Sequence, residues 1–187
     1  LGGILKDLGN LEEAKLSTSK AIELNPQSAE AYSNLGGILR DLGNLEEAEL
    51  TTRKSIELNP QFAEAYSNLG GILRDLGNLE EAELSTRKAI ELNPQFAEAY
   101  LNLGSISRDL SNLEEAELSA KKAIKLNPQF AEAYSNLGNI YRDLDRISEA
   151  KESYKKSLDL EPDEIHRIGN YLDILNLLCL WDDVDKY

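Results

Sequence analysis

The chain has 187 residues, 41% of them hydrophobic, and its 34 acidic and 20 basic side chains give a net charge of −14. This acidity disfavours binding to nucleic acids and to anionic membrane surfaces, because such binding depends on Lys and Arg side chains that neutralise phosphates. No apolar run approaches the roughly 18–20 residues of a membrane span, and no secretory signal pattern is present.

The scarcity of reactive side chains argues against a catalytic or metal site. His166 is the single His and Cys179 the single Cys, so neither a nucleophilic triad nor a metal cluster can be built from them. We therefore expect no enzyme activity, no metal and no cofactor in this chain. One cysteine cannot form an internal disulfide, and nothing indicates an oxidising compartment, so we expect a cytoplasmic protein.

A 34-residue repeat organises the chain. Residues 63–96 are identical to residues 29–62 at all but two positions. A constant period of this length indicates an array of one supersecondary unit. Positions within a repeat are numbered 1 to 34 below, with residue 63 at position 1. One proline recurs near the end of each copy: Pro26, Pro60, Pro94, Pro128 and Pro162.

The first half of each repeat predicts a helix that ends at a glycine. In residues 63–96, apolar side chains recur at i, i+3, i+4 and i+7 between Ala65 and Leu76, which is the spacing of one helix face. Gly77 follows as a residue that tolerates the positive φ of a helix C-cap. Asn78 is then expected to cap a second helix, with Glu81 forming a variant of the capping box.

The second half predicts a helix that ends before Pro94, because proline disfavours helical backbone at the residue before it. The apolar set of this helix comprises Leu79, Ala82, Leu84, Ala89, Ile90 and Leu92. A glycine at position 8, inside the first helix, is expected to let two helices approach closely. Because such a glycine costs about 1 kcal/mol of helix propensity relative to Ala, these helices are expected to depend on packing between neighbours. These glycines are Gly36, Gly70, Gly104 and Gly138.

The repeat resembles the tetratricopeptide repeat (TPR) family. The family pattern asks for large residues at positions 4, 11 and 24, Leu-Gly at 7 and 8, Ala at 20 and 27, and Pro at 32. Thr86, at position 24, departs from this pattern. The matching residues are Tyr66, Leu69, Gly70, Leu73, Ala82, Ala89 and Pro94.

This resemblance covers residues 1 to about 162. It implies an all-α, right-handed TPR superhelix (α-α solenoid) of antiparallel helix pairs. It also implies a protein-protein interaction scaffold that binds an extended peptide or another protein partner on its concave face. The expected array occupies residues 1–164, with a partial first unit at 1–28 and full units at 29–62, 63–96, 97–130 and 131–164. Residues 165–187 are expected to be a degenerate half-unit, or a capping helix leading to a missing C-terminal region.

An alternative function follows from the segment LCLWDD, residues 178–183. This segment is similar to the end of the TPR region in O-GlcNAc transferases, where a Cys-x-Trp-Asp segment leads toward the glycosyltransferase domain. The chain would then be the substrate-recognition arm of a larger enzyme of this kind, with the catalytic domain beyond Tyr187.

A third interpretation is a structural, self-associating array. The chain begins without Met, inside a repeat, so we expect it to be a piece of a longer protein. Leu1, Gly2 and Ile4 would then expose an uncapped apolar edge, and unit ends could stack on another copy.

Position 6 of the repeat carries an asparagine on the side of the first helix that lines the concave surface in TPR arrays. An amide offers both a donor and an acceptor, so a row of them can hydrogen-bond an extended peptide backbone, as the resemblance to O-GlcNAc transferases implies. Small neighbours such as Ser33 and Gly71 would leave the groove open. Asparagine before Leu-Gly is also common in TPR units that bind nothing in this way, and the sequence leaves both interpretations open. The asparagine row comprises Asn34, Asn68, Asn102, Asn136 and Asn170.

Positions 12 and 13 carry an arginine row and an aspartate row on the same side. The favoured interpretation is that the two rows pair between neighbouring units, although contact of the arginines with an acidic peptide stays open. Glutamate at position 2 argues against a clamp for C-terminal carboxylates, which it would repel. The arginine row comprises Arg40, Arg74, Arg108 and Arg142, and the aspartate row comprises Asp41, Asp75, Asp109 and Asp143.

Overall fold

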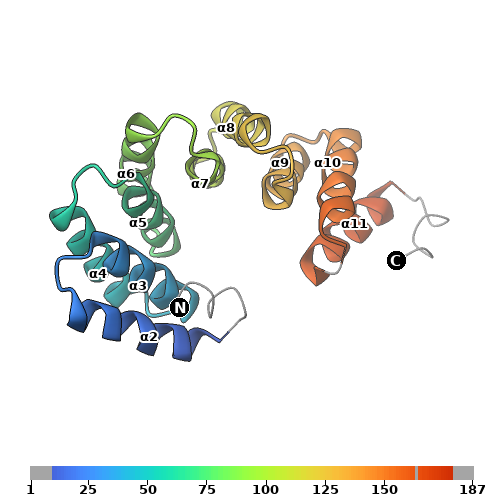
Figure 1. Ribbon diagram of the computed structural model, residues 1–187. Coiled ribbons are helices and arrows are strands. Elements are labelled where there is room, and N and C mark those ends of the chain that lie inside the picture. Colours follow the sequence, from blue (N-terminus) through green and yellow to red (C-terminus); the bar gives the residue numbers. More distant parts are fainter. Residues whose placement is uncertain (1–9, 163, 179–187) are drawn as a thin grey trace. The chain divides into compact units, whose positions relative to one another are not determined.

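The computed structural model describes residues 10–162 and 164–178. Within these ranges the chain is all-α, with ten helices and no strand, as the repeat predicts. None of these helices is both long and apolar enough to cross a membrane. The helices are α2 (Leu11–Leu24), α3 (Ala29–Asp41), α4 (Leu45–Leu58), α5 (Ala63–Asp75), α6 (Leu79–Leu92), α7 (Ala97–Asp109), α8 (Leu113–Leu126), α9 (Ala131–Asp143), α10 (Ile147–Leu160) and α11 (Ile165–Leu177) (Figure 1).

The helices form antiparallel pairs joined by short turns. The first helix of each pair, called the A helix below, has 13 residues, and the second, called the B helix, has 14. The A helices are α3, α5, α7, α9 and α11, and the B helices are α2, α4, α6, α8 and α10. The A helices α3, α5, α7 and α9 each pack most extensively on the B helix that follows, and α11 packs on α10.

The chain divides into two compact units, residues 1–95 and residues 96–187. Unit 1 contains α2 to α6. In it, α3 lies beside α5, and α4 packs on both α3 and α5. Unit 2 contains α7 to α11, with α7 beside α9 and α10 packed on α11. In each unit, therefore, neighbouring A helices lie next to one another.

The turn between A and B helices requires a residue with positive φ at position 15. Gly43 and Gly77 adopt φ values of 79° and 81°, which confirms the expected C-cap glycine. Ser111 and Asp145 occupy the same position in unit 2, with φ values of 61° and 58°. The turn geometry is thus kept in unit 2 without the residue that adopts it most easily.

The expected capping box at Asn78 is not formed. Asn78 is the N-cap of α6, but its side chain makes no capping hydrogen bond, and the Glu81 carboxylate accepts a hydrogen bond from Arg53 at 2.6 Å. The equivalent Asn10 and Asn112 do cap their helices by accepting a backbone N–H. At Asn78 the turn is held by the backbone, since its N–H donates to the carbonyl of Leu73 at 2.8 Å.

The close approach predicted at the position-8 glycines is confirmed. A Cβ atom added to Gly70 would lie 2.1 Å from Oγ1 of Thr86, and one added to Gly138 would lie 2.6 Å from the ring of Tyr154. At Gly104 the nearest atom would be the carbonyl oxygen of Ala116, at 3.3 Å. The backbone of the B helix lies at nearly the same distance at Gly70 and Gly104, and the residue at position 24 determines which side chain an added Cβ atom would meet.

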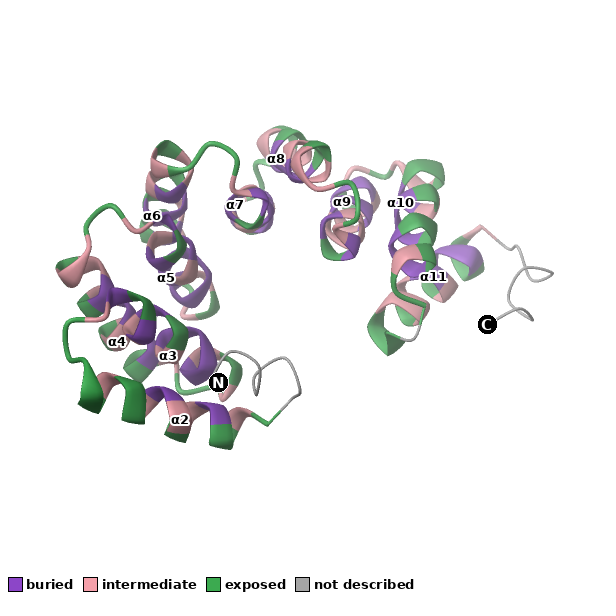
Figure 2. Ribbon diagram, viewed as in Figure 1, coloured by how far each residue is buried: buried purple, intermediate pink, exposed green. Residues whose placement is uncertain are grey.

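The apolar set predicted for the second helix is wrong at Leu84. Leu84 is 69% exposed, whereas Ala82, Ser85 and Ala89 are buried. Leu84 lies two positions after Ala82, which corresponds to about 200° around a helix, so the two side chains lie on nearly opposite sides. The B helices α2, α4, α6 and α8 thus bury only small residues, and Figure 2 shows buried and exposed residues alternating around α2, α4 and α6.

Candidate functional site

In unit 1 the asparagine row lies where α3 and α5 meet. Asn34, on α3, is exposed, and Asn68, on α5, is half-buried. The amide Nδ2 of Asn68 donates to Oγ of Ser33 at 2.9 Å and approaches the Ser33 carbonyl oxygen at 3.4 Å. The side chain of Asn68 is therefore held in one orientation by the neighbouring A helix.

In unit 2 the same anchoring recurs with one change of partner. Asn170 donates to Oγ of Ser135 at 3.3 Å, in the register of unit 1. Asn136 donates instead to Oγ of Ser105 at 2.6 Å. In the preceding repeat, residues 97–130, position 5 is the buried Leu101, which has no hydroxyl to accept the hydrogen bond. The Oδ1 atom of Asn136 is buried without a hydrogen-bond partner among the described residues.

The serine partners were missed at the level of sequence, where they were interpreted as small residues that keep a groove open. The signal that could have identified Ser33 and Ser135 is their position, directly before an asparagine of the row, whereas Ser105 has no such neighbour. The remaining member of the row, Asn102, is half-buried on α7. Asparagines of both units thus contribute to packing between A helices as well as to the surface.

The arginine row pairs with the aspartate row within each unit. Nε of Arg40 lies 2.5 Å from Oδ2 of Asp75, and Nε of Arg108 lies 2.5 Å from Oδ2 of Asp143. These contacts confirm the expected pairing at two positions. A Cβ atom added to Gly71 would lie 2.6 Å from a guanidinium nitrogen of Arg40, so the second glycine of this helix makes room for the arginine.

The A helices also carry two further arginines of the row and a glutamate at position 2. Arg74 and Arg142 are half-buried on α5 and α9, at the positions equivalent to the two paired arginines. The glutamates at position 2 lie in the first turn of their A helices, whereas the arginines lie in the last turn. All four glutamates are exposed: Glu30, Glu64, Glu98 and Glu132.

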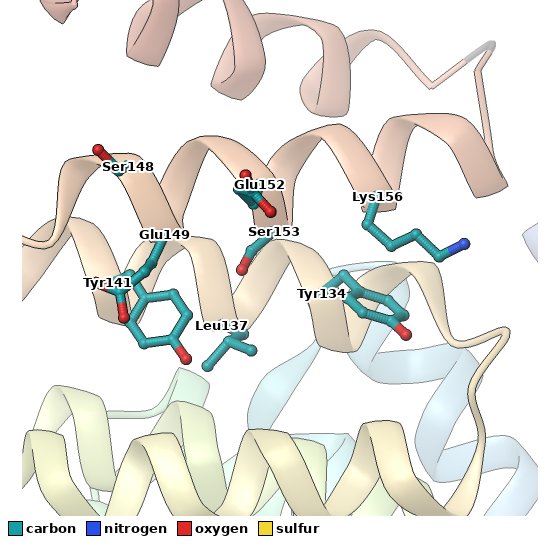
Figure 3. A pocket seen from close by; sticks show the side chains of 8 residues that line it. All are labelled: Tyr134, Leu137, Tyr141, Ser148, Glu149, Glu152, Ser153 and Lys156. Carbon is teal, nitrogen blue, oxygen red and sulfur yellow. The ribbon is translucent and has the colours of Figure 1, made fainter.

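A second candidate site is a cavity of about 570 Å³ in unit 2, between α9 and α10. In Figure 3, Tyr141 and Glu149 lie at one end of the cavity, and Tyr134 and Lys156 lie at the other. The cavity therefore combines an apolar and aromatic wall from α9 with a charged wall from α10. Its lining comprises Tyr134, Leu137, Tyr141, Ser148, Glu149, Glu152, Ser153 and Lys156.

A network of charges lies beside Tyr141 and Glu149, at one end of this cavity. The guanidinium of Arg146 lies 4.3 Å from the centre of the Tyr141 ring and 2.7 Å from a carboxylate oxygen of Glu117. Burial raises the pKa of Glu117, but hydrogen bonds and charges from Lys121 and Arg146 outweigh burial and hold that pKa below its usual value. The hydrogen bond from Arg146 likewise lowers the pKa of Glu149. Both carboxylates are therefore ionised at neutral pH.

Possible metal ligands and polar surface groups can be located among the described residues. In residues 10–162 and 164–178, no group of three or more His, Cys, Asp or Glu side chains could hold a metal ion. His166 is exposed at the start of α11, and Cys179 lies outside the described residues. What the described surface provides is amides, ion pairs and aromatic rings, which bind ligands by hydrogen bonding and packing.

Family models of the tetratricopeptide repeat match much of the chain. One matches residues 63–96 and 131–164, and a second matches residues 18–49 and 86–117. Two further TPR models match residues 104–142 and residues 1–28. Comparison with curated proteins gives no match.

Solved TPR structures resemble the chain over most of its length. TTC0263, a thermophilic TPR protein of Thermus thermophilus, is 26% identical with a TM-score of 0.86, over 93% of this chain and 95% of that one. MamA is 27% identical with a TM-score of 0.65, over 87% and 95%. YrrB, described as a TPR protein with an unusual peptide-binding site, is 25% identical with a TM-score of 0.62, over 90% and 87%.

The predicted similarity to O-GlcNAc transferases gains no support from these comparisons, and the residues that suggested it, 179–183 in particular, lie outside the described part of the chain. The repeat itself is supported by sequence and by structure. Its 34-residue period, its paired helices and the family models that match it along the chain show that the chain belongs to the tetratricopeptide repeat family.

Proposed function

We propose that the chain is a protein-interaction scaffold whose A helices bind an extended peptide through the asparagine row. The observation that carries this proposal is the anchoring of Asn68 and Asn170 by serines of the neighbouring A helix. Donation by Nδ2 leaves the carbonyl oxygen of the same amide to accept a backbone N–H from a ligand. An amide that is already oriented loses less conformational entropy when it binds.

The charges of the A helices favour a neutral or basic peptide. Arg40 and Arg108 are paired with aspartates, so they are not free to attract an acidic ligand. The exposed glutamates at position 2 repel carboxylates and attract Lys or Arg side chains. An acidic peptide or a C-terminal carboxylate fits this surface poorly.

The comparisons support peptide binding in general terms. TPR proteins commonly bind other proteins, and YrrB is described as having a peptide-binding site. The same family can also form arms of larger proteins. The interpretation as a recognition arm of a glycosyltransferase stays a prediction, and the sequence that follows Tyr187 in the parent protein tests it.

Asparagine variants test the proposal directly. Asn68→Ala and Asn170→Ala are combined, and binding to an array of extended peptides is measured by fluorescence anisotropy. We expect affinity to fall by at least about tenfold, the effect of losing roughly 1.4 kcal/mol of hydrogen bonding. Asn136 is left unchanged, because its carbonyl oxygen is buried.

Two controls separate ligand contact from packing. Asn176→Ala removes an exposed asparagine of α11 that is outside the row, and it should leave binding unchanged. Ser33→Ala keeps the Asn68 amide but removes its anchor, and it should weaken binding less than Asn68→Ala does. Equal affinity of the double variant and the parent chain, or no peptide bound by the parent chain, would contradict the proposal.

A further inference from the structure

A row of exposed leucines runs along the B helices at position 22, and we call it the outer leucine row. It comprises Leu16, Leu50, Leu84 and Leu118, which are 61%, 71%, 69% and 70% exposed. A single exposed leucine is ordinary on a protein surface. Recurrence at one position in four successive B helices needs another reason, because these helices bury their alanines, serines and threonines instead.

Each outer leucine lies between an acidic and a basic residue on the same side of its helix. On α4, Glu46 precedes Leu50 by four residues and Lys54 follows it by four. Residues four apart are neighbours along a helix surface. The same order of Glu, Leu and Lys is found on the other three helices: Glu12, Leu16 and Lys20 on α2; Glu80, Leu84 and Lys88 on α6; and Glu114, Leu118 and Lys122 on α8.

This pattern is complementary to itself when two such helices meet antiparallel. Leucine then packs on leucine, Glu46 faces the Lys54 of the other copy, and Lys54 faces its Glu46. A parallel pair would place like charges against one another, which is unfavourable. Two-fold symmetry gives the antiparallel arrangement, and it is the commonest symmetry of protein dimers.

We propose that two copies of this chain associate through the outer leucine row of unit 1, with their B helices antiparallel. α4 and α6 present the same order of Glu, Leu and Lys, so the charges and leucines match whether α4 meets α4 or α6 of the second copy. The partner is a second copy because the order of Glu, Leu and Lys on these helices matches itself in both charge and apolar position.

The lysines can exchange their present partners at little cost. Nζ of Lys54 lies 2.9 Å from Glu57, and Nζ of Lys88 lies 2.8 Å from Glu91, and both pairs are on the surface. Exposed ion pairs of this kind contribute little to stability. Replacing each one by a pair across a partly buried interface therefore costs the folded chain little.

The repeat at residues 131–164 provides an internal control. Its position 22 is Glu152, which is exposed on α10, while Lys156 keeps the basic position. Two copies of α10 in the same antiparallel arrangement would oppose Glu152 to itself, with no apolar contact. The outer leucine row therefore ends before α10.

Sedimentation velocity of the full chain, from micromolar to millimolar concentration, tests the proposal. We expect the parent chain to form a reversible dimer and the variant Leu50→Lys with Leu84→Lys to stay monomeric. Circular dichroism should be unchanged, because both side chains are mostly exposed. A monomeric parent chain, or a variant that associates as the parent does, would overturn the proposal. The second result would point to the unit ends, where Leu1, Gly2 and Ile4 lie outside the described residues.

Charge reversal tests the antiparallel arrangement. Lys54→Glu with Lys88→Glu should weaken the dimer by at least about tenfold, and adding Glu46→Lys with Glu80→Lys should restore it. Lys156→Glu, on α10, is the matched control and should change nothing. Failure of the added substitutions to restore association would overturn the arrangement. Asn68→Ala should leave the dimer intact, so this test is independent of peptide binding.

Discussion

The α5–α6 pair of unit 1 and the α9–α10 pair of unit 2 have helices of equal length, but the space between those helices is filled differently. In unit 1 the small Thr86 lies against Gly70, and its hydroxyl donates to the carbonyl of Ala82 at 2.8 Å. In unit 2 the ring of Tyr154 lies against Gly138. One backbone thus accepts two very different side chains at position 24.

The difference extends to the polar groups around each pair. The hydroxyl of Tyr154 hydrogen-bonds the side chain of Asn139 at 2.8 Å, and burial raises the pKa of that hydroxyl. The same pair carries Tyr141 and the cavity beside it. Both units bury aliphatic side chains, but unit 1 has a small residue against its position-8 glycine, whereas the end of unit 2 adds the buried rings of Tyr141, Tyr154 and Tyr171.

The largest effect should come from truncation at position 24. Tyr154 is 1% exposed, so Tyr154→Ala removes a buried ring and should cost about 3–5 kcal/mol of unfolding free energy. Thr86→Ala removes one methyl group and one hydrogen bond and should cost about 1 kcal/mol. Urea denaturation of both variants measures the difference. Similar losses would mean that the two pairs do not differ in what stabilises them.

Substitutions at position 8 should give an intermediate effect. Gly70→Ala forces a Cβ atom toward Oγ1 of Thr86 and should cost about 1–3 kcal/mol, whereas Gly104→Ala meets its nearest neighbour at 3.3 Å and should cost less. Thr86→Ala should relieve the cost of Gly70→Ala in a double-mutant cycle. Purely additive effects of Gly70→Ala and Thr86→Ala would contradict the close contact as the cause.

The smallest effect is expected at the turns. Asp145 and Ser111 have positive φ, so Asp145→Gly or Ser111→Gly should raise the unfolding free energy by up to about 1 kcal/mol. The reverse change in unit 1, Gly77→Ser, should lower it by a similar amount. Thermal denaturation of the three variants measures these changes in stability. A loss of stability in Asp145→Gly would show that the Asp145 side chain itself stabilises the turn.

The repeat made the helices predictable, since each signal was present several times. The apolar spacing and Gly77 were sufficient to place α5, the turn and α6. The exposure of Leu84 was not predictable from composition, because it depends on which side of the helix packs, and small residues form that side. Apolar character alone did not distinguish a core leucine from a surface one.

The candidate site was predicted in part. The pairing of Arg40 with Asp75 was predicted because both rows recur, whereas peptide binding by the asparagine row stays a prediction. It did not identify Ser33 as the partner of Asn68, since a small polar residue at position 5 carries no charge that would point to a partner, unlike the arginine and aspartate rows. The cavity at Tyr141 and Glu152 lies where the repeat departs from its own pattern, and no second copy was available to reveal it.

The near identity of the repeats in unit 1 has a consequence for folding. α3 and α5 have the same sequence, so α6 finds equivalent contacts on either helix. What distinguishes them is the connection, which is the short turn 76–78 for α5 and the segment 42–78 for α3. Closing the longer loop costs about 2 kcal/mol more by the logarithmic dependence on loop length. Chain connectivity, rather than the contacts themselves, selects the partner of α6.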